Sequence, residues 1–341
     1  MKDFKYLIAY LLPASAFLGL EWKGYWLFFT VLFAFGLLPL GDILLPQYKN
    51  NTPEAEETTR AQVRLFDWLL YLHLPLLYLL IINALYVFKN NHLSIVEMIG
   101  MSISVGIIVG SFGINVAHEL GHRSNPTEQF ISKALLLPAL YMHFFIEHNL
   151  GHHKNVATDE DPASARMGEN VYSFWFRSVK DSYKSAWQLE AERLKKKGAS
   201  VYSIDNQMIV FQIIQMIYLI LIGIFFGYAS ILMAIGFAVT AFLLLESVNY
   251  IEHYGLRRQK LASGRYEPVL PKHSWNSNHE LGRIFLYELT RHADHHYKST
   301  RKYQILRHYE DAPQLPFGYP MSILIALLPP LWFKMMDKRV L

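Results

Sequence analysis

The stretch ISVGIIVGSFGINVAHELGH, residues 103–122, joins an apolar run to two histidines that stand four residues apart. The apolar run begins near residue 94, and a helix of roughly 20 apolar residues crosses a bilayer core of about 30 Å. On such a helix His118 and His122 lie one turn apart on the same face, so both imidazoles can reach one metal ion. The stretch therefore predicts a membrane helix that ends in part of a metal site.

Three more histidine clusters occur where apolar sequence gives way to polar sequence. They are EHNLGHH at 147–153, NYIEHYG at 249–255 and RHADHH at 291–296. Catalytic zinc sites use about three protein ligands, so the nine histidines of the four clusters predict a dinuclear centre at a membrane surface. The nine are His118, His122, His148, His152, His153, His253, His292, His295 and His296.

Spacing within the clusters suggests how the histidines divide between two ions. His148 and His152 repeat the four-residue spacing, whereas His153 is rotated by about 100° around a helix and is expected to face a different ion. His292 has two further histidines within one turn, so the cluster at 291–296 is expected to face both ions. His253 stands alone at a helix end and is the weakest candidate.

The composition limits the kinds of cofactor that the chain can hold. Of its 341 residues 52% are hydrophobic, and none is cysteine. Without cysteine, the chain cannot form a disulfide, a Cys-ligated zinc site, a Cys₄ iron–sulfur centre or a thiolate-ligated haem. Any iron that transfers electrons to this chain must therefore arrive on another protein.

The apolar residues gather into membrane-length runs, which predict an all-α integral membrane protein with six transmembrane helices and a cytosolic helical cap. Ala14-Ser15-Ala16 imitates a signal-peptide cleavage site, so a secretory signal is the alternative for the first run. We expect a single domain over residues 1–341. The expected spans are about 5–20, 25–45, 66–88, 94–117, 209–227 and 229–250.

The basic residues predict the orientation of these spans. All of the 32 Lys and Arg residues except Lys23 and Lys89 fall on one side of the membrane when the helices pair as hairpins. The positive-inside rule makes that side cytoplasmic and places the catalytic segments 118–208 and 251–341 there. Segments 130–147 and 318–335 are apolar but interrupted, and we expect both to be interfacial.

All-imidazole ligation favours iron, copper or zinc over magnesium or manganese. A metal-bound imidazole usually donates its second N–H to a carboxylate or another acceptor, so nearby polar residues are candidates for that role. Asp159 and Asp161 are also candidates, but for both of them a place on the surface is an equal alternative. The main candidates are Glu119, Glu147, Glu252, Asp294, Asn249 and His279.

Two other functions remain open from the residues alone. HELGH is also the pattern of zinc proteases, in which Glu119 would be the general base, but an intramembrane zinc protease leaves seven histidines without a role. The second open function is a membrane receptor or scaffold that stores or senses metal. Such a role does not account for the apolar setting of the site.

The histidine motifs and their flanks resemble those of a known family. The order HELGH, EHNLGHH, HADHH is similar to the three histidine boxes of the membrane fatty-acid desaturase and hydroxylase superfamily. FFIEHNLGHH, DPASARMGE, NYIEHYGL, SWNSNH and RHADHH with TRKYQILR closely resemble the alkane 1-monooxygenase (alkane ω-hydroxylase) family, from about residue 6 to the C-terminus.

The resemblance implies a non-haem di-iron monooxygenase with two iron ions held by the nine histidines. Such an enzyme converts the terminal methyl of an n-alkane to a primary alcohol with O₂, using electrons from rubredoxin and its NADH-dependent reductase. It implies a multi-pass protein of the bacterial inner membrane with a cytosolic active site, in contact with membrane lipid. A related hydroxylase for methyl-substituted aromatics such as xylene is the alternative, and no motif suggests nucleic-acid binding.

A substrate tunnel is expected to run between the spans toward the irons, and the resemblance implies that bulk in the second helix limits chain length. The small Ala34 would then leave depth for longer alkanes. Arg257, Arg258, Lys260 and Arg265 form a basic stretch that suits an acidic electron carrier or anionic lipid headgroups. The residues expected to line the tunnel are Phe33, Ala34, Phe35, Leu37 and Leu38.

Overall fold

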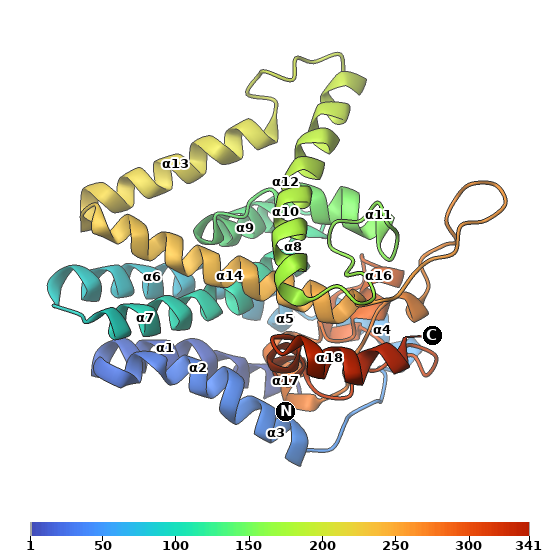
Figure 1. Cartoon of the computed structure of the whole chain (residues 1–341), viewed down its shortest axis with the longest axis horizontal. Helices are drawn as coiled ribbons and strands as arrows, with labels where there is room; N and C mark the ends of the chain where they lie inside the picture. The colour runs from blue at the N-terminus through green and yellow to red at the C-terminus, as the bar shows by residue number, and fades with distance from the viewer. Residues whose placement is uncertain (1, 341) are drawn as a thin grey trace.

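The computed structural model describes residues 2–340, and all regular structure in them is helical apart from isolated backbone bridges (Figure 1). Six helical segments are long and apolar enough to cross a membrane, which confirms the predicted fold. Their ends lie within four residues of the predicted ones. The six are Asp3–Trp22, Gly24–Leu44, Arg64–Asn90, Ile95–Gly121, Gln207–Phe226 and Ala229–His253.

Four of the six spans are compound, because shorter helices continue one another. The first joins a 3₁₀ segment to α1, the second joins α2 and α3, the third joins α5 and α6, and the fourth joins α7 and α8. The last two spans are the single helices α13 and α14. The bounds are α1 Leu11–Trp22, α2 Phe29–Leu32, α3 Leu38–Leu44, α5 Arg64–Tyr71, α6 His73–Asn90, α7 Ile95–Ile108, α8 Asn115–Gly121, α13 Gln207–Phe226 and α14 Ala229–His253.

The remaining helices are short, except for the long amphipathic helix α12. The segment predicted to be interfacial before His148 forms α9 and α10, and it is not among the six spans. The bounds are α4 Glu54–Ala61, α9 Pro126–Leu136, α10 Phe144–Glu147, α11 His153–Asn155, α12 Val171–Lys196, α15 Glu280–Phe285, α16 His292–Tyr297, α17 Tyr319–Ala326 and α18 Pro329–Met336.

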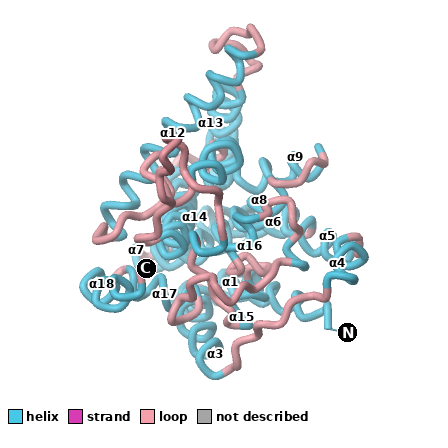
Figure 2. The backbone as a smooth tube through the Cα atoms, turned by 90° about the vertical axis from the view of Figure 1, so that its right-hand side faces the viewer, coloured by secondary structure: helices cyan, strands magenta, loops and turns pink. Residues whose placement is uncertain are grey.

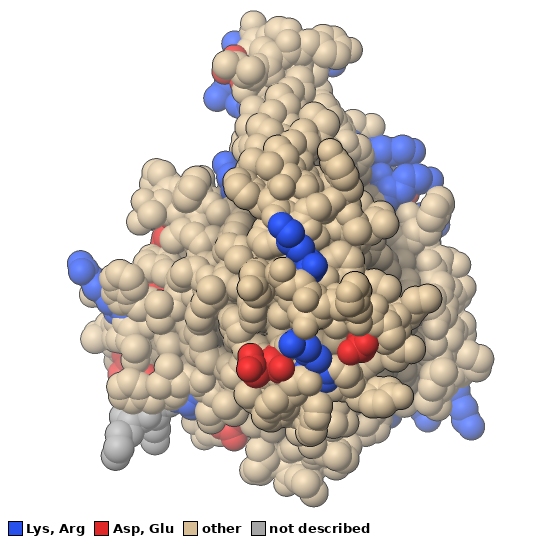
Figure 3. Space-filling view, turned by 90° about the vertical axis from the view of Figure 1, so that its left-hand side faces the viewer, with Lys and Arg blue, Asp and Glu red and all other residues tan. Residues whose placement is uncertain are grey.

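The spans run side by side, and the helices that carry histidine gather at one end of the bundle (Figure 1). Seen from that end, short helices and loops surround α16 (Figure 2). The opposite end presents a mostly uncharged surface, with a few charged side chains near its middle and along its rim (Figure 3). This polarity agrees with six spans capped on one side by the segments that follow α8 and α14.

The first span packs into this bundle through Leu12, Ala16 and Leu20, which are buried in the main core. α7 and α14 approach closely at Gly106, where an added Cβ would lie 2.3 Å from Cβ of Thr240. Small residues permit such close helix approach in membranes. The first hydrophobic run is therefore part of the folded bundle and is expected to span.

Three short π-helical segments interrupt the helices, and all three lie near the histidine clusters or the cavity described below. They are Phe33–Leu37 between α2 and α3, Val109–Ile114 between α7 and α8, and His148–His152 between α10 and α11. A π segment inserts an extra residue and so rotates the side chains that follow it. A sequence reading at 3.6 residues per turn does not detect this rotation.

The C-terminal tail is bent and does not form one straight spanning helix. α17 and the helical segment Pro329–Arg339 meet at an angle of 119°. Pro329 and Pro330 begin α18, and a proline ring is compatible with the first turn of a helix but not with its interior. α17 packs against α14 and so lies beside the histidine cluster.

A buried ion pair holds the segment between α15 and α16 in place. Glu288 lies 2.6 Å from the Arg283 guanidinium and accepts a hydrogen bond of 2.6 Å from the Tyr6 hydroxyl. Arg291 donates to the backbone oxygens of Asn50 and Leu306. These bonds join the N-terminal span, the loop after α3 and the start of α16, and they fix the position of the third histidine box.

Candidate metal centre

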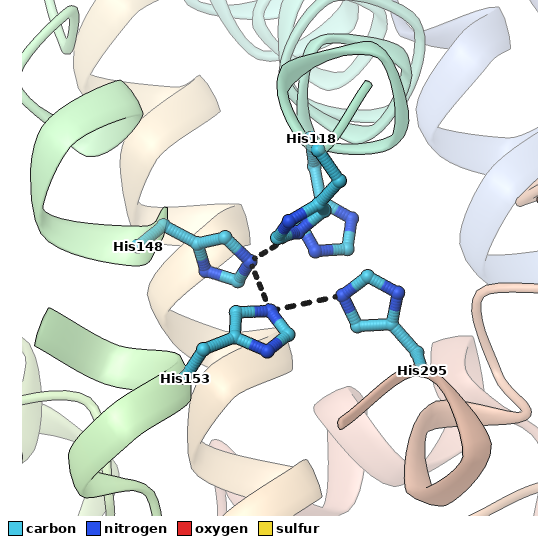
Figure 4. A group of neighbouring side chains, drawn as sticks. His118, His148, His153 and His295 are labelled. Carbon is cyan, nitrogen blue, oxygen red and sulfur yellow. Dashed lines mark hydrogen bonds between the residues drawn. The ribbon is translucent and has the colours of Figure 1, made fainter. Parts of the chain in front are cut away.

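The nine predicted histidines come together in two adjacent groups. Within each group every residue offers one ring nitrogen, and these nitrogens all lie within 4.8 Å of one another. Figure 4 labels four residues of the first group, whose rings point toward one another from α8, the π-helical segment His148–His152, α11 and α16. The first group is His118, His122, His148, His153 and His295, and the second is His152, His253, His292 and His296.

The division between the groups differs from the prediction in the second cluster. His153 was expected to face a different ion from His148, but His148 and His153 share the first group and His152 joins the second. The pair on α8 stays together as expected, and α16 contributes to both groups as expected. His253, the weakest candidate from sequence, lies in the second group with its Nε2 3.1 Å from Nε2 of His292.

Asp161 explains why His152 turns away from His148. Nδ1 of His152 lies 2.9 Å from Oδ2 of Asp161, and this contact leaves Nε2 to point into the second group. The Ser164 hydroxyl and the Ala163 amide both donate to the carboxylate, at 2.5 and 3.1 Å. Burial distinguishes the two aspartates, and residue spacing does not predict it: Asp161 is buried and Asp159 is exposed.

The residues present fit a pair of metal ions. Several buried ring nitrogens lack any hydrogen-bond partner within residues 2–340, including both nitrogens of His118 and of His296 and Nε2 of His152. Buried polar atoms are normally satisfied, so these nitrogens indicate a ligand.

The spacing of the nitrogens in the first group also fits. Nε2 of His148 lies 3.1 Å from that of His122 and 3.0 Å from that of His153, which lies 3.1 Å from that of His295. With metal–nitrogen bonds of about 2.1 Å, neighbouring ligands lie roughly 3.0 Å apart at right angles and roughly 3.4 Å apart in a tetrahedron. Four of the five nitrogens are thus linked at the spacing of ligands on one ion, and the fifth, from His118, lies within 4.8 Å of each of them.

The imidazoles are held in the neutral form that binds metals. Burial lowers the pKa of His148, His153 and His295 well below the usual value, and the neighbouring imidazoles lower it further. His152 is the exception: burial lowers its pKa, but the charge of Asp161 outweighs burial and leaves the pKa raised. An acidic partner of this kind increases the basicity of a metal-bound imidazole.

Of the other predicted supporting residues, Glu252 contacts a ligand histidine. Its Oε2 lies 3.2 Å from Nε2 of His292, and its Oε1 accepts a hydrogen bond of 2.7 Å from the Tyr319 hydroxyl. Glu147 is buried beside the centre and accepts from Ser185 instead of an imidazole. The side-chain amide of Asn249 donates to Glu246 at 3.3 Å.

The predictions for Glu119, Asp294 and His279 were wrong, because each is engaged elsewhere. Glu119 binds the Arg123 guanidinium at 3.0 Å. Asp294 accepts from the Arg301 guanidinium at 2.5 Å and from the Tyr309 hydroxyl. His279 contacts Ser277 and Gln47. Glu119 and Asp294 face largely buried arginine side chains, and His279 faces the loop after α3.

A large apolar cavity ends on the metal centre. Its volume is about 930 Å³, and at one end it is lined by His118 and His148 of the first group and His292 of the second. The rest of its wall is mostly apolar, with Ser111, Asn115, Asn249, Glu252 and Tyr319 as the polar exceptions, and comes largely from α1, α7, α14, α15 and α17 as well as the second span. The cavity therefore connects both histidine groups to the space between the spans.

The second span lines this cavity, although not with every residue predicted. Ala34, Phe35 and Leu38 line it. Leu37 is 49% exposed on the outer face, and Phe33 packs against Phe285 with ring centroids 5.7 Å apart, so the predictions for these two were wrong. The π segment at Phe33–Leu37 decides which side chains face inward.

Four carboxylates are buried around the nine histidines: Glu147, Asp161, Glu246 and Glu252, all at most 3% exposed. Among the described residues none of them pairs with a lysine or arginine at salt-bridge distance. Burying unpaired charge is costly: burial raises the pKa of Glu147, and the neighbouring carboxylates Asp161 and Glu246 raise it further. Two divalent ions bound by neutral imidazoles would supply compensating positive charge for those that are ionised.

Comparisons with known proteins agree with this site. The profile of the fatty acid desaturase family matches residues 96–323. The chain is 39% identical to alkane 1-monooxygenase 1 of Alcanivorax borkumensis, over 100% of this chain and 85% of that protein. It is 42% identical to alkane 1-monooxygenase of Acinetobacter baylyi, over 89% and 74%. The hydroxylase component of xylene/toluene monooxygenase of Pseudomonas putida is more distant, at 27% over 99% and 89%.

Proposed function

The chain belongs to the fatty acid desaturase family and, within it, to the alkane 1-monooxygenases, and from this premise we propose that it hydroxylates the terminal methyl of n-alkanes to primary alcohols. The overall reaction consumes R–CH₃, O₂, two electrons and two protons and gives R–CH₂OH and water. The enzyme class is an oxidoreductase that acts at a metal centre in a multi-pass membrane protein.

One observation carries the proposal: an apolar cavity of about 930 Å³ reaches histidines of both groups. An unfunctionalised hydrocarbon offers no polar group for recognition, so its binding site must be an apolar channel that places one end of the chain at the reactive centre. A protease site would instead need to admit a polar peptide backbone together with the water that cleaves it. The cavity supports an alkane better than any polar substrate.

The nine histidines would hold two iron ions, which supply the activation of O₂ when bound. Iron suits the imidazole ligands, and the five-nitrogen group exceeds the four ligands of a tetrahedral zinc site. The protein's own contributions are positional. Asp161 orients His152, the apolar wall excludes water, and the cavity presents the methyl end of the substrate to the centre.

The electron donor in this proposal is a separate rubredoxin with its NADH-dependent reductase, because the chain has no cysteine for an iron site of its own. His122 and His153 are the only partly exposed members of the nine, so the first group lies nearer to the water-exposed surface. Of the basic stretch, Arg258 is held by backbone oxygens, which leaves Arg257, Lys260 and Arg265 to face an acidic carrier.

We further propose that the protein resides in a bacterial inner membrane with the centre on the cytosolic side, as the distribution of lysine and arginine favours. Residues 1–341 form a single domain in this proposal, because spans from both halves of the chain line one cavity and contribute to one centre.

Product analysis with purified components tests the function. The protein, in detergent or nanodiscs, is supplied with rubredoxin, reductase, NADH and either an n-alkane series or toluene and xylenes. We expect 1-alkanols as the main products and much slower oxidation of the aromatics. Faster turnover of xylene would assign the chain to the aromatic hydroxylases, and absence of any oxidised product would contradict the proposal.

A further inference from the structure

A second, smaller pocket adjoins the metal centre from inside the protein. Its volume is about 250 Å³, and it touches one histidine of each group, His148 and His152. Unlike the substrate cavity, this pocket is lined mainly by polar side chains. They are Tyr141, His143, Glu147, Ser182, Glu246 and Asn249.

Glu246 is the centre of the hydrogen-bond network around this pocket. Its carboxylate accepts hydrogen bonds from the Tyr141 hydroxyl at 2.9 Å, from the Ser178 hydroxyl at 2.5 Å and from the Asn249 amide at 3.3 Å. Glu246 is 1% exposed and lies in the last span, two helical turns before His253. Ionisable residues inside membrane helices are costly and usually mark a functional path.

The pocket has the properties of a water site. Nε2 of His143, a residue that is 5% exposed, has no hydrogen-bond partner among the described residues, and the ring lines the pocket. No lysine or arginine of the described chain lines it. An enclosed polar pocket with an unsatisfied buried nitrogen and several hydroxyl and carboxylate groups is suited to hold an ordered water.

The position of the pocket relative to the cavity suits it to supply protons to the metal centre. The reaction consumes two protons, and the hydroxyl and amide donors of the substrate cavity are engaged elsewhere: Ser111 donates to the Ile107 oxygen, Asn115 to the Leu286 oxygen and Tyr319 to Glu252. Phe144, His148 and Asn249 line both spaces, so these side chains form the partition between the pocket and the reactive end of the cavity. Protons can therefore reach the centre from the pocket without passing through the substrate channel.

We propose that this pocket is the proton entrance of the reaction, with Glu246 as the residue that holds the proton. This inference rests on the proposed function. The Glu246 carboxyl gives its proton to the pocket water, which passes a proton to the oxygen atom that leaves as H₂O. After Glu246 is reprotonated, the same route delivers the second proton, and the two electrons come from rubredoxin. Glu246 is left as a carboxylate, stabilised by its three donors, and regains a proton from bulk water.

The Glu246→Gln variant tests the proposal, because the amide keeps the size of the side chain and can still accept hydrogen bonds but cannot supply the proton. We expect unchanged iron content, a fall in kcat of roughly 100-fold as for loss of a general acid, and a lower ratio of alcohol formed to NADH consumed. The solvent deuterium isotope effect on kcat should rise. Glu246→Asp should restore part of the rate.

Glu190→Gln is the matched control, since Glu190 is also fully buried but binds Arg193 on the far part of α12. It should keep the kcat, coupling and isotope effect of the unaltered enzyme. Should Glu246→Gln fail to fold, Ser182→Val serves as a second probe, because it removes a water partner and narrows the pocket without altering a carboxylate.

Three results would count against the idea. Unaltered kcat, coupling and isotope effect in Glu246→Gln, or in Ser182→Val where the first variant does not fold, would overturn the proton entrance while leaving the hydroxylase function in place. Equal losses in Glu190→Gln would assign the effect to general destabilisation and overturn it too. Absence of alcohol from the unaltered enzyme would overturn both proposals.

Discussion

At the scale of single residues, one carboxylate divides the histidines. The spacing of HNLGHH alone favours His148 and His152 on one ion, and Asp161 reverses that pairing by binding Nδ1 of His152. Asp161 lies nine residues away in an irregular loop, so no helical periodicity could predict the contact. The conformation of this loop buries Asp161, and burial strengthens its contact with Nδ1 of His152.

Asp161→Asn should therefore weaken the second metal group selectively. The amide cannot carry the negative charge that supports His152, and losing such a partner typically costs 10- to 100-fold in metal affinity. We expect the iron content under limiting metal to fall from two toward one per chain, measured by mass spectrometry of the metal. Asp159→Asn, an exposed neighbour, is the control and should keep both ions. Equal iron content in the two variants would contradict the assigned role.

Ala34→Trp should shorten the alkanes that the enzyme accepts, because Ala34 lines the cavity and an indole would fill its depth. Leu37→Trp is the matched control on the same span, since Leu37 lies 49% exposed on the outer face. The chain-length profile of turnover is the measurement. A shift in the Leu37 variant, or none in the Ala34 variant, would show that the cavity is not the substrate channel.

At the scale of elements, periodicity was enough to place the spans but not to orient every side chain. Apolar runs of membrane length predict helices because the bilayer core leaves few alternatives for the backbone. The π segments are set by local packing, such as that of Phe33 on Phe285, and they carry no sequence signature. The errors at Phe33, Leu37 and His152–His153 all fall in or beside these segments.

The segment between α15 and α16 should depend on the buried ion pair of Glu288. Burial raises the pKa of Glu288, but Arg283 and neighbouring cations outweigh it and lower the pKa from 4.5 to about 2. A lowered pKa contributes stability above pH 4.5, and that contribution is lost as the pH falls toward 2. Removing one partner of a buried pair costs about 3–5 kcal/mol.

We therefore expect Glu288→Gln to lower the thermal midpoint at neutral pH, measured by fluorescence-detected unfolding of metal-free protein. The difference from the unaltered chain should shrink as the pH is lowered below 4.5. The exposed Glu310→Gln is the control. A midpoint equal to that of the unaltered chain at pH 7 would show that the pair does not hold the third histidine box.

At the scale of the whole molecule, the set of nine histidines was predictable from sequence, since each cluster lies where a span meets polar sequence. Their division into groups of five and four was not, because it depends on contacts between segments far apart in the chain, such as His153 with His295. Among the carboxylates expected to support the ligands, Glu252 lies 3.2 Å from Nε2 of His292, whereas Glu119 and Asp294 pair with arginines that the three-dimensional fold brings to them.

Removing the metal should destabilise the whole bundle, because the nine imidazoles and the buried carboxylates around them would lose the positive charge that joins them. An ion at 100 times its Kd stabilises by about 2.7 kcal/mol. Chelation should lower the thermal midpoint, and added Fe²⁺ should restore it. Identical midpoints with and without chelator would mean that the centre does not hold metal in the folded protein.

The metal content of the purified, active protein tests the central claim most directly. Two adjacent groups of histidine nitrogens, one of five and one of four, predict two iron ions per chain by mass spectrometry of the metal. One zinc ion per chain, with no iron, would contradict the account.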